Sequence, residues 1–476
     1  MRAPIAAIAF RPASRGESWI VAAAIVALAL LAGLAAGDRS LEWTIPMAAI
    51  GGGTVLYLGA RWPFTGLLVM LATSILLVAV RAVGNRSLNA IDVLLMPVFL
   101  ASVFGRARRE TSANARYGLG HDDIHVAERR FVQIVVLFHG LALLSLVQLG
   151  VLVGVHAALD SALLLLRAVQ ALMFYPLCRW WLDRKDRIDM AWRAVIVGGA
   201  ALATTSVIGL VVWDVRRPGM TFYLNDPLAP LASPNEAGVN ALFVAAVLVV
   251  RQSMRPDWKN LVLMALMAVV VALTQSRSAL LASGIFVLGT MRWLRPRHVL
   301  AGVLASASIL PLLPVHFWQR MAKSLVVERG SFEAMSALQR VYGWRTAWRV
   351  FLDHPWTGIG YLGFRFVSNR YNALRLNLVT VENYFYEILI SMGIVGLVVI
   401  SIVVVRLFKL GREIGRVAPE GTLASHMARV HGPLVLALLA ANLTGDNFLG
   451  LVSLAQLALW CAVLVSAGHA DVAAQR

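Results

Sequence analysis

Charged residues are scarce in this chain: only 14% of its 476 residues are Asp, Glu, Lys or Arg. Soluble globular proteins carry roughly a quarter of their residues as charges, so this composition excludes that class. Hydrophobic residues make up 59% of the chain, which also excludes an intrinsically disordered protein. A mean hydropathy of +0.73 indicates a protein that crosses a membrane several times.

Cysteine is nearly absent. The two cysteines, Cys178 and Cys461, each lie inside or at the edge of an apolar run. Two residues placed in this way provide no disulfide framework and show no metal-ligand spacing. A secreted disulfide scaffold is therefore excluded, and we expect neither a metal ion nor another cofactor.

Acidic residues are also few, 25 against 43 Lys and Arg, and the net charge of +18 resembles that of a nucleic-acid-binding protein. Most of the basic residues fall in short loops on one side of the apolar stretches. This is the asymmetry that the positive-inside rule describes for cytoplasmic loops. We therefore expect both termini in the cytoplasm, contact with membrane lipid, and no nucleic-acid partner.

A helix that crosses the bilayer needs about 20 mostly apolar residues. Fourteen stretches of the chain have this character, and they predict an all-α polytopic membrane protein with about 14 transmembrane helices. The stretches are centred on residues 18–36, 43–60, 63–82, 88–105, 131–153, 157–178, 192–213, 237–253, 260–275, 278–294, 298–316, 383–408, 430–446 and 449–468. The predicted domains are 1–316 with eleven helices, a large outer loop at 317–382, and 383–476 with the last three helices.

Two outer segments are longer than the other loops, at 214–236 and 317–382. Within the second, apolar residues recur at helical spacing over 335–352. This spacing predicts an amphipathic helix that lies over the bundle or on the membrane surface. Both a functional cap and a simple interfacial anchor fit the pattern.

Charged and amide side chains near the ends of apolar spans are costly and usually have a task. Four such groups fall on the predicted outer side: Arg216 and Arg217 with Asn235 and Glu236; Arg277 within 274–278; Arg340, Arg345 and Arg349; and Glu382 and Asn383 with Glu387. Each group also has a structural reading. The paired arginines can bind lipid headgroups, the arginine face of the loop helix can be solvated, and Glu382 can serve the helix dipole alone.

Arginine binds phosphate and diphosphate in a bidentate manner, and a nearby carboxylate is a candidate general base. The outer groups therefore indicate a lipid-linked phosphate or diphosphate substrate. A second hypothesis is a transporter, such as a lipid-linked oligosaccharide flippase, for which the mid-span Arg167 would be the relevant charge. Arg167 can instead pair with Asp160 or with backbone carbonyls. A third hypothesis is a purely structural membrane protein, which would give the outer arginines no function.

The same residues carry a family resemblance. The chain resembles the O-antigen ligase and O-antigen polymerase superfamily over about 200–410, through four segments that occur in the family's order around one large loop. They are Pro234–Ala237 (PNEA), Thr274–Leu281 (TQSRSALL), Arg340-x-x-x-Trp344 followed by His354–Gly360 (HPWTGIG), and Glu382–Gly396 (ENYFYEILISMGIVG).

This resemblance implies a GT-C-like, metal-independent, inverting glycosyltransferase of the bacterial inner membrane with a periplasmic active site. The donor would be a glycan linked to undecaprenyl diphosphate, and the acceptor another lipid-linked glycan or the lipid A–core. Polysaccharide-assembly proteins are candidate partners. By position, Glu382 and Arg277 would be catalytic. Substrate binding would fall to Arg216, Arg217, Asn235, Arg340 and Asn383.

The chain departs from the ligase pattern at one position. Ligases of this superfamily carry His-Asn where this chain has Glu382-Asn383. A carboxylate can act as a base, so transfer activity is compatible with the change. The difference favours a polymerase of polysaccharide repeat units, with a ligase as the alternative.

Overall fold

The computed structural model describes residues 62–76, 79–81, 87–107, 122–212, 234–274, 276–293, 332–372, 380–443 and 451–474, with a few isolated positions between them. Two of the predicted site residues, Arg216 and Arg217, lie outside the described residues. So do the first two predicted spans and nearly all of the span predicted at 298–316.

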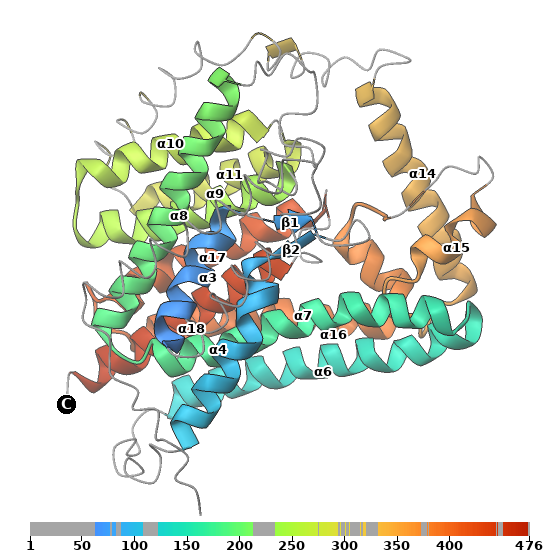
Figure 1. Ribbon diagram of the computed structural model, residues 1–476, viewed down its shortest axis with the longest axis horizontal. Helices are drawn as coiled ribbons and strands as arrows, with labels where there is room; N and C mark the ends of the chain where they lie inside the picture. The colour runs from blue at the N-terminus through green and yellow to red at the C-terminus, as the bar shows by residue number, and fades with distance from the viewer. Residues whose placement is uncertain are drawn as a thin grey trace, which may run out of the picture.

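The described part of the chain is almost entirely helical (Figure 1). The helices are α3 (Pro63–Leu76), α4 (Ala90–Ala107), α6 (Asp122–Leu152), α7 (Val155–Trp181), α8 (Lys185–Val212), α9 (Pro234–Met254), α10 (Trp258–Thr274), α11 (Arg277–Thr290), η1 (Met291–Trp293), α14 (Phe332–Asp353), α15 (Phe364–Tyr371), α16 (Tyr384–Val417), α17 (Leu423–Leu443) and α18 (Leu451–Ala473). A short antiparallel hairpin joins α3 to α4. Its strands are β1 (Ala79–Arg81) and β2 (Ser87–Asn89), with Val80 opposite Leu88.

Six of the described helices are long and apolar enough to cross a membrane: α6, α7, α9, α16, α17 and α18. Two shorter apolar helices, α3 and α10, accompany them. Each of the eight coincides with a predicted apolar stretch, so the chain is a helical polytopic membrane protein. The total of fourteen spans stays a prediction, as does the division into domains.

Helices α9 and α18 form the centre of the bundle. In the most apolar stretch of each, 78% of the residues are buried, against 22% in α6. Phe243 of α9 and Trp460 of α18 meet there edge to face, with ring centroids 6.0 Å apart. Helix α6 packs beside α7 and α16 along one edge of the molecule (Figure 1). Its exposed apolar side chains, such as Leu144 and Val147, suit a helix that faces lipid.

The predicted amphipathic helix of the large loop exists as α14. Together with α15 it lies beyond one end of α6, α7 and α16 (Figure 1). Between α14 and α15, residues 354–363 form a tight turn, here named the docking turn. Its backbone is held by α6, because Ser145 Oγ accepts from the Tyr361 N–H at 3.0 Å and Gln148 donates to the Gly358 carbonyl.

The docking turn inserts into a break in α16. Gly393 has φ 64° and ψ −160°, which interrupts the helix and frees backbone groups on both sides. The docking turn takes up these groups: Ile359 N–H donates to the Ile390 carbonyl at 2.9 Å, and Ile394 N–H donates to the Pro355 carbonyl at 2.8 Å. A break within a span is tolerated when protein groups satisfy the backbone in this way. A Cβ at Gly393 would overlap the carbonyl of Trp356.

Candidate functional site

The first residues of α16 are fixed by Asn383. Its Oδ1 accepts from the N–H groups of Phe385 and Tyr386 at 3.0 and 3.1 Å, which is the geometry of a helix N-cap. Its Nδ2 donates to the carbonyl of Leu443 at the end of α17, at 2.8 Å. Asn383 is 7% exposed, and both ends of its amide contact the protein. These contacts give it a positioning role, and direct substrate binding by Asn383 stays a prediction.

Glu382 immediately precedes this cap. Its φ of 49° lies in the left-handed region, which is uncommon for a residue with a side chain and costs about 1 kcal/mol or more. Its carboxylate forms an ion pair with Arg340 of α14. The side chains of Arg340 and Glu382 are 27% and 44% exposed, so the pair remains open to a ligand. Strained residues of this kind cluster at functional sites.

Helix α14 holds this segment at a second point, one turn further along. The indole Nε1 of Trp344 donates to the carbonyl of Val381 at 3.2 Å. The Trp344 ring also stacks on Tyr386 with centroids 6.2 Å apart and an interplanar angle of 11°. The left-handed backbone at Glu382 is therefore set by contacts on both sides, from Trp344 before it and from the Asn383 cap after it.

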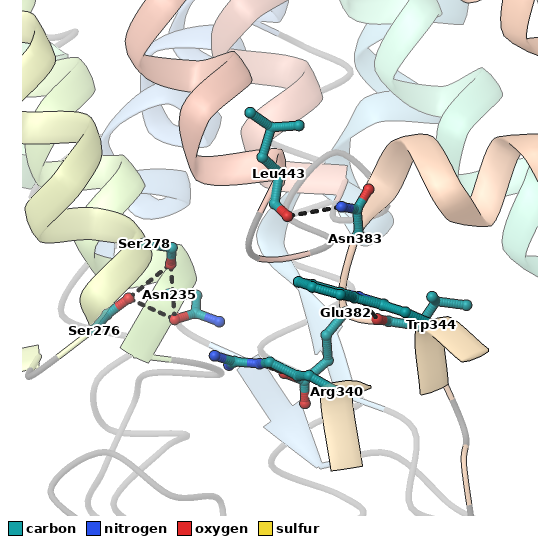
Figure 2. Close-up of polar contacts among 9 residues, drawn as sticks. Asn235, Ser276, Ser278, Arg340, Trp344, Glu382, Asn383 and Leu443 are labelled. Carbon is teal, nitrogen blue, oxygen red and sulfur yellow. Dashed lines mark hydrogen bonds and ion pairs between the residues drawn. The ribbon is translucent and has the colours of Figure 1, made fainter. Parts of the chain in front are cut away.

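A second polar cluster is formed by Asn235, Ser276 and Ser278. Asn235 lies in the first turn of α9, and its Oδ1 accepts from Ser276 Oγ at 2.6 Å and from Ser278 Oγ at 3.3 Å. Ser276 is also the N-cap of α11, since its Oγ accepts from the Ala279 N–H at 3.2 Å. In the view of Figure 2 the guanidinium of Arg340 points toward this cluster.

A close approach of α9 to α11 brings this cluster together. A Cβ at Gly238 would overlap the Cβ of Ala279, so only glycine fits at this crossing. Gly238 lies one turn after Asn235, and Ala279 directly follows Ser278. The small residues thus let the two helix starts meet, as they do at other close helix contacts in membranes.

Arg277 is the first residue of α11 and is exposed. It lies between Ser276 and Ser278, so the Asn235 cluster and Arg277 share one turn. The structure therefore brings Asn235 to the Arg277 turn and Arg340 to Glu382. The proposed roles of all these residues stay predictions.

Glu387 lies within the first turn of α16 and is 3% exposed. Its Oε1 accepts from Ser391 Oγ at 3.4 Å. Tyr361 of the docking turn lies near it. Burial, and secondly the charge of Glu387, raises the pKa of Tyr361, so this phenol stays protonated at neutral pH. Glu387 is thus a buried carboxylate at the start of a transmembrane helix.

Several features of the site were not predicted from the sequence. Ser276 and Ser278 appeared only as part of a motif, although they are the direct partners of Asn235. The ion pair of Arg340 with Glu382 joins residues 42 positions apart, which no local pattern reveals. A glycine inside a long apolar span was the available signal for the break at Gly393.

Comparison with protein families gives a match to this part of the chain. Residues 262–401 match the model of the O-antigen ligase family. This segment is thus similar to proteins of the O-antigen ligase family. The matched segment includes Arg277, Arg340, Glu382 and Asn383, as well as the docking turn, whereas Asn235 lies before it. A search among curated proteins gave no match.

The match confirms the resemblance to the O-antigen ligase and polymerase superfamily that the four motifs indicate. The family implies a lipid-linked glycan and an acceptor as substrates of a membrane enzyme. It leaves open which acceptor is used, and it assigns no role to an individual residue. The proposed function therefore rests on the geometry at the start of α16.

Proposed function

We propose that this protein transfers a glycan from undecaprenyl diphosphate to an acceptor sugar, and that it polymerises repeat units of a surface polysaccharide. The observation that carries the proposal is the ion pair of Arg340 with Glu382, at a strained residue inside the segment that matches the O-antigen ligase family. A carboxylate and a guanidinium held together at a helix start supply a base and a binding group for an anion.

Glu382 is the general base of this reaction. It accepts the proton of the acceptor hydroxyl as that oxygen attacks the anomeric carbon of the donor sugar from the face opposite the diphosphate. The bond from the anomeric carbon to the diphosphate oxygen breaks, and the electron pair leaves with the diphosphate. The configuration inverts, and no metal ion takes part.

Arg340 holds the carboxylate of Glu382 in place. Arg340 can also engage another anion when substrates bind. The donor diphosphate is such an anion, and a guanidinium has five N–H donors to share between it and Glu382.

The other predicted residues act on the donor. Arg277, with Arg216 or Arg217, stabilises the negative charge that develops on the departing diphosphate, as preorganised cations do. Asn235 fixes the turn that carries Arg277, through its contacts with Ser276 and Ser278.

The site belongs to the periplasmic side of the inner membrane. The starts of α9, α11 and α16 carry predicted outer residues, and contacts join α9 to α11 and the start of α16 to the end of α17. We propose a GT-C-like bundle of about 14 transmembrane helices with both termini in the cytoplasm. The loop at 317–382 caps the site from the periplasm.

A carboxylate in place of the ligases' histidine favours the polymerase over the ligase. A lipid-linked oligosaccharide flippase is the other alternative, and Arg167 within α7 is the observation that motivates it. In a strain that lacks the gene, lipid-linked substrate accumulates outside if a polymerase is lost and inside if a flippase is lost.

Reconstitution tests the proposal directly. The purified protein is placed in vesicles with an undecaprenyl-diphosphate-linked repeat unit, with and without lipid A–core. A ladder of longer lipid-linked glycans without lipid A–core supports the polymerase. Product that requires lipid A–core shows a ligase instead. No product from well-folded protein in either case overturns the transferase.

A further inference from the structure

A third polar cluster lies at the start of α6, at the end away from the docking turn. His125 and Glu128 stand in the first two turns of α6, and His469 in the last turns of α18. One ligand atom from each of the three residues can be chosen so that all lie within 4.8 Å of one another. The imidazole rings of His125 and His469 have centroids 4.3 Å apart. The cluster thus joins two helices that are far apart in the sequence.

The carboxylate of Glu128 is already oriented by its neighbours. Its Oε1 accepts from Tyr175 at 2.7 Å and from Arg179 Nε at 2.8 Å. Arg179 is itself fixed by Ser466, to which its Nη1 donates at 2.7 Å. The Oε2 of Glu128 accepts from Arg179 Nη2 at 3.3 Å and lies 3.9 Å from His469 Nε2.

A second observation concerns the Nε2 atom of His469. It is buried, and among the residues that the structure describes it has no hydrogen-bond partner. A buried imidazole nitrogen without a partner is costly, because it loses its bond to water without a replacement. It faces a carboxylate oxygen and lies beside a second imidazole, an arrangement that a shared cation would satisfy.

We propose that His125, Glu128 and His469 bind a divalent zinc-class cation. Imidazole and carboxylate are ligands that Zn²⁺ accepts, and three protein ligands with one water form a common set. Ligand atoms around a tetrahedral zinc ion lie about 3.3 Å apart, so the three ligand atoms, now within 4.8 Å of one another, need to draw in by up to about 1.5 Å. His125 is exposed, which leaves room for water at the fourth position.

The hydrogen-bond partners of Glu128 suit a carboxylate that binds a metal ion. Ligating carboxylates are usually hydrogen-bonded by other groups, which set their orientation. Tyr175 and Arg179 hold Oε1, and Arg179 also donates to Oε2, so the ion would bind the remaining lone pair of Oε2. The guanidinium of Arg179 opposes a second positive charge nearby, and we therefore expect micromolar rather than tighter affinity.

This cation would be structural and would take no part in glycan transfer. His125 lies 23 residues before Gln148, the α6 residue that contacts the docking turn. At about 1.5 Å per residue the two points are roughly 35 Å apart along the helix. The ion would connect the start of α6 to the end of α18, and its presence is independent of the proposed enzymatic function.

Zinc binding by the full-length protein in detergent tests the inference. After treatment with a chelator, Zn²⁺ is titrated calorimetrically and the thermal unfolding midpoint is followed, with Mg²⁺ as the comparison cation. We expect about one Zn²⁺ per chain and a higher midpoint with Zn²⁺ but not with Mg²⁺, because a ligand that binds only the folded state stabilises it.

His125→Ala and His469→Gln are the test variants, and His156→Ala, at the exposed start of α7, is the matched control. We expect each test variant to bind Zn²⁺ at least tenfold more weakly and the control to bind as the wild type does. His125 is exposed, so its variant is expected to fold even if His469→Gln does not. Wild-type protein that fails to bind Zn²⁺, or a His125→Ala protein that binds it equally well, overturns the proposal.

Discussion

Arg340 on α14 forms an ion pair with Glu382, the residue directly before the N-cap of α16. Both side chains are partly exposed, so the pair itself contributes only about 0–1 kcal/mol to stability. Its importance lies in its location. It joins the large loop to the start of a transmembrane helix, within the segment that matches the O-antigen ligase family.

The first prediction concerns the coupling of these two residues. If Arg340 acts mainly through Glu382, then Arg340→Ala and Glu382→Gln should not have additive effects on the transfer rate. Each single change should reduce the rate by about 100-fold or more, and the double variant should be little worse than either. Rates from reconstituted vesicles provide the measurement. Fully additive losses would show that the two residues act separately.

The second prediction separates strain from chemistry at Glu382. Glycine adopts a φ of 49° without the cost that a side chain imposes. Glu382→Gly should therefore leave the thermal unfolding midpoint unchanged or raise it, because the relieved strain of about 1 kcal/mol offsets the lost ion pair. Transfer should be abolished. A clear drop of the midpoint would mean that Glu382 is mainly structural.

The third prediction concerns the cap. Asn383→Ala removes the acceptor for two backbone N–H groups and the donor to Leu443, and should cost about 1–2 kcal/mol of folding stability. Asn383→Ser keeps a cap acceptor and should recover part of this loss. Thermal unfolding in detergent compares the two variants. Equal stability of Asn383→Ala and the wild type would argue against the positioning role.

The fourth prediction compares two glycines. Gly238→Ala places a Cβ against Ala279 and should destabilise the protein by about 1–3 kcal/mol. Gly284→Ala, on α11, meets no neighbour and should be neutral or stabilising by up to about 1 kcal/mol, because alanine favours the helix. Thermal unfolding of both proteins checks the opposite signs. Similar effects at the two positions would contradict the close approach of α9 and α11.

Much of the helical framework could be predicted from apolar length alone, because a helix in a bilayer must satisfy its own backbone. The helix over 335–352 and the start of α16 near Glu382 also follow from local patterns. The break at Gly393 does not, since it depends on the docking turn some 35 residues earlier in the chain. Hydrophobicity cannot show which loop satisfies a broken helix.

The candidate site could also be predicted only in part from the sequence. Spacing and family resemblance select Glu382, Arg277 and Asn235 as polar residues at span ends. Which of them meet is decided by helix packing: Gly238 allows α9 to approach α11, and Trp344 fixes α14 over Val381. These contacts join distant parts of the chain, so only the folded structure pairs Arg340 with Glu382.

The central claim is that Glu382 accepts the proton of the acceptor hydroxyl. Its most direct test is the rate of glycan transfer by Glu382→Gln in reconstituted vesicles, with Glu420→Gln as the control, since Glu420 is 96% exposed on its side chain and distant in sequence. We predict a loss of about 10²–10⁴-fold for Glu382→Gln at an unchanged unfolding midpoint, and none for the control. A Glu382→Gln protein that elongates glycan at the wild-type rate would contradict the account.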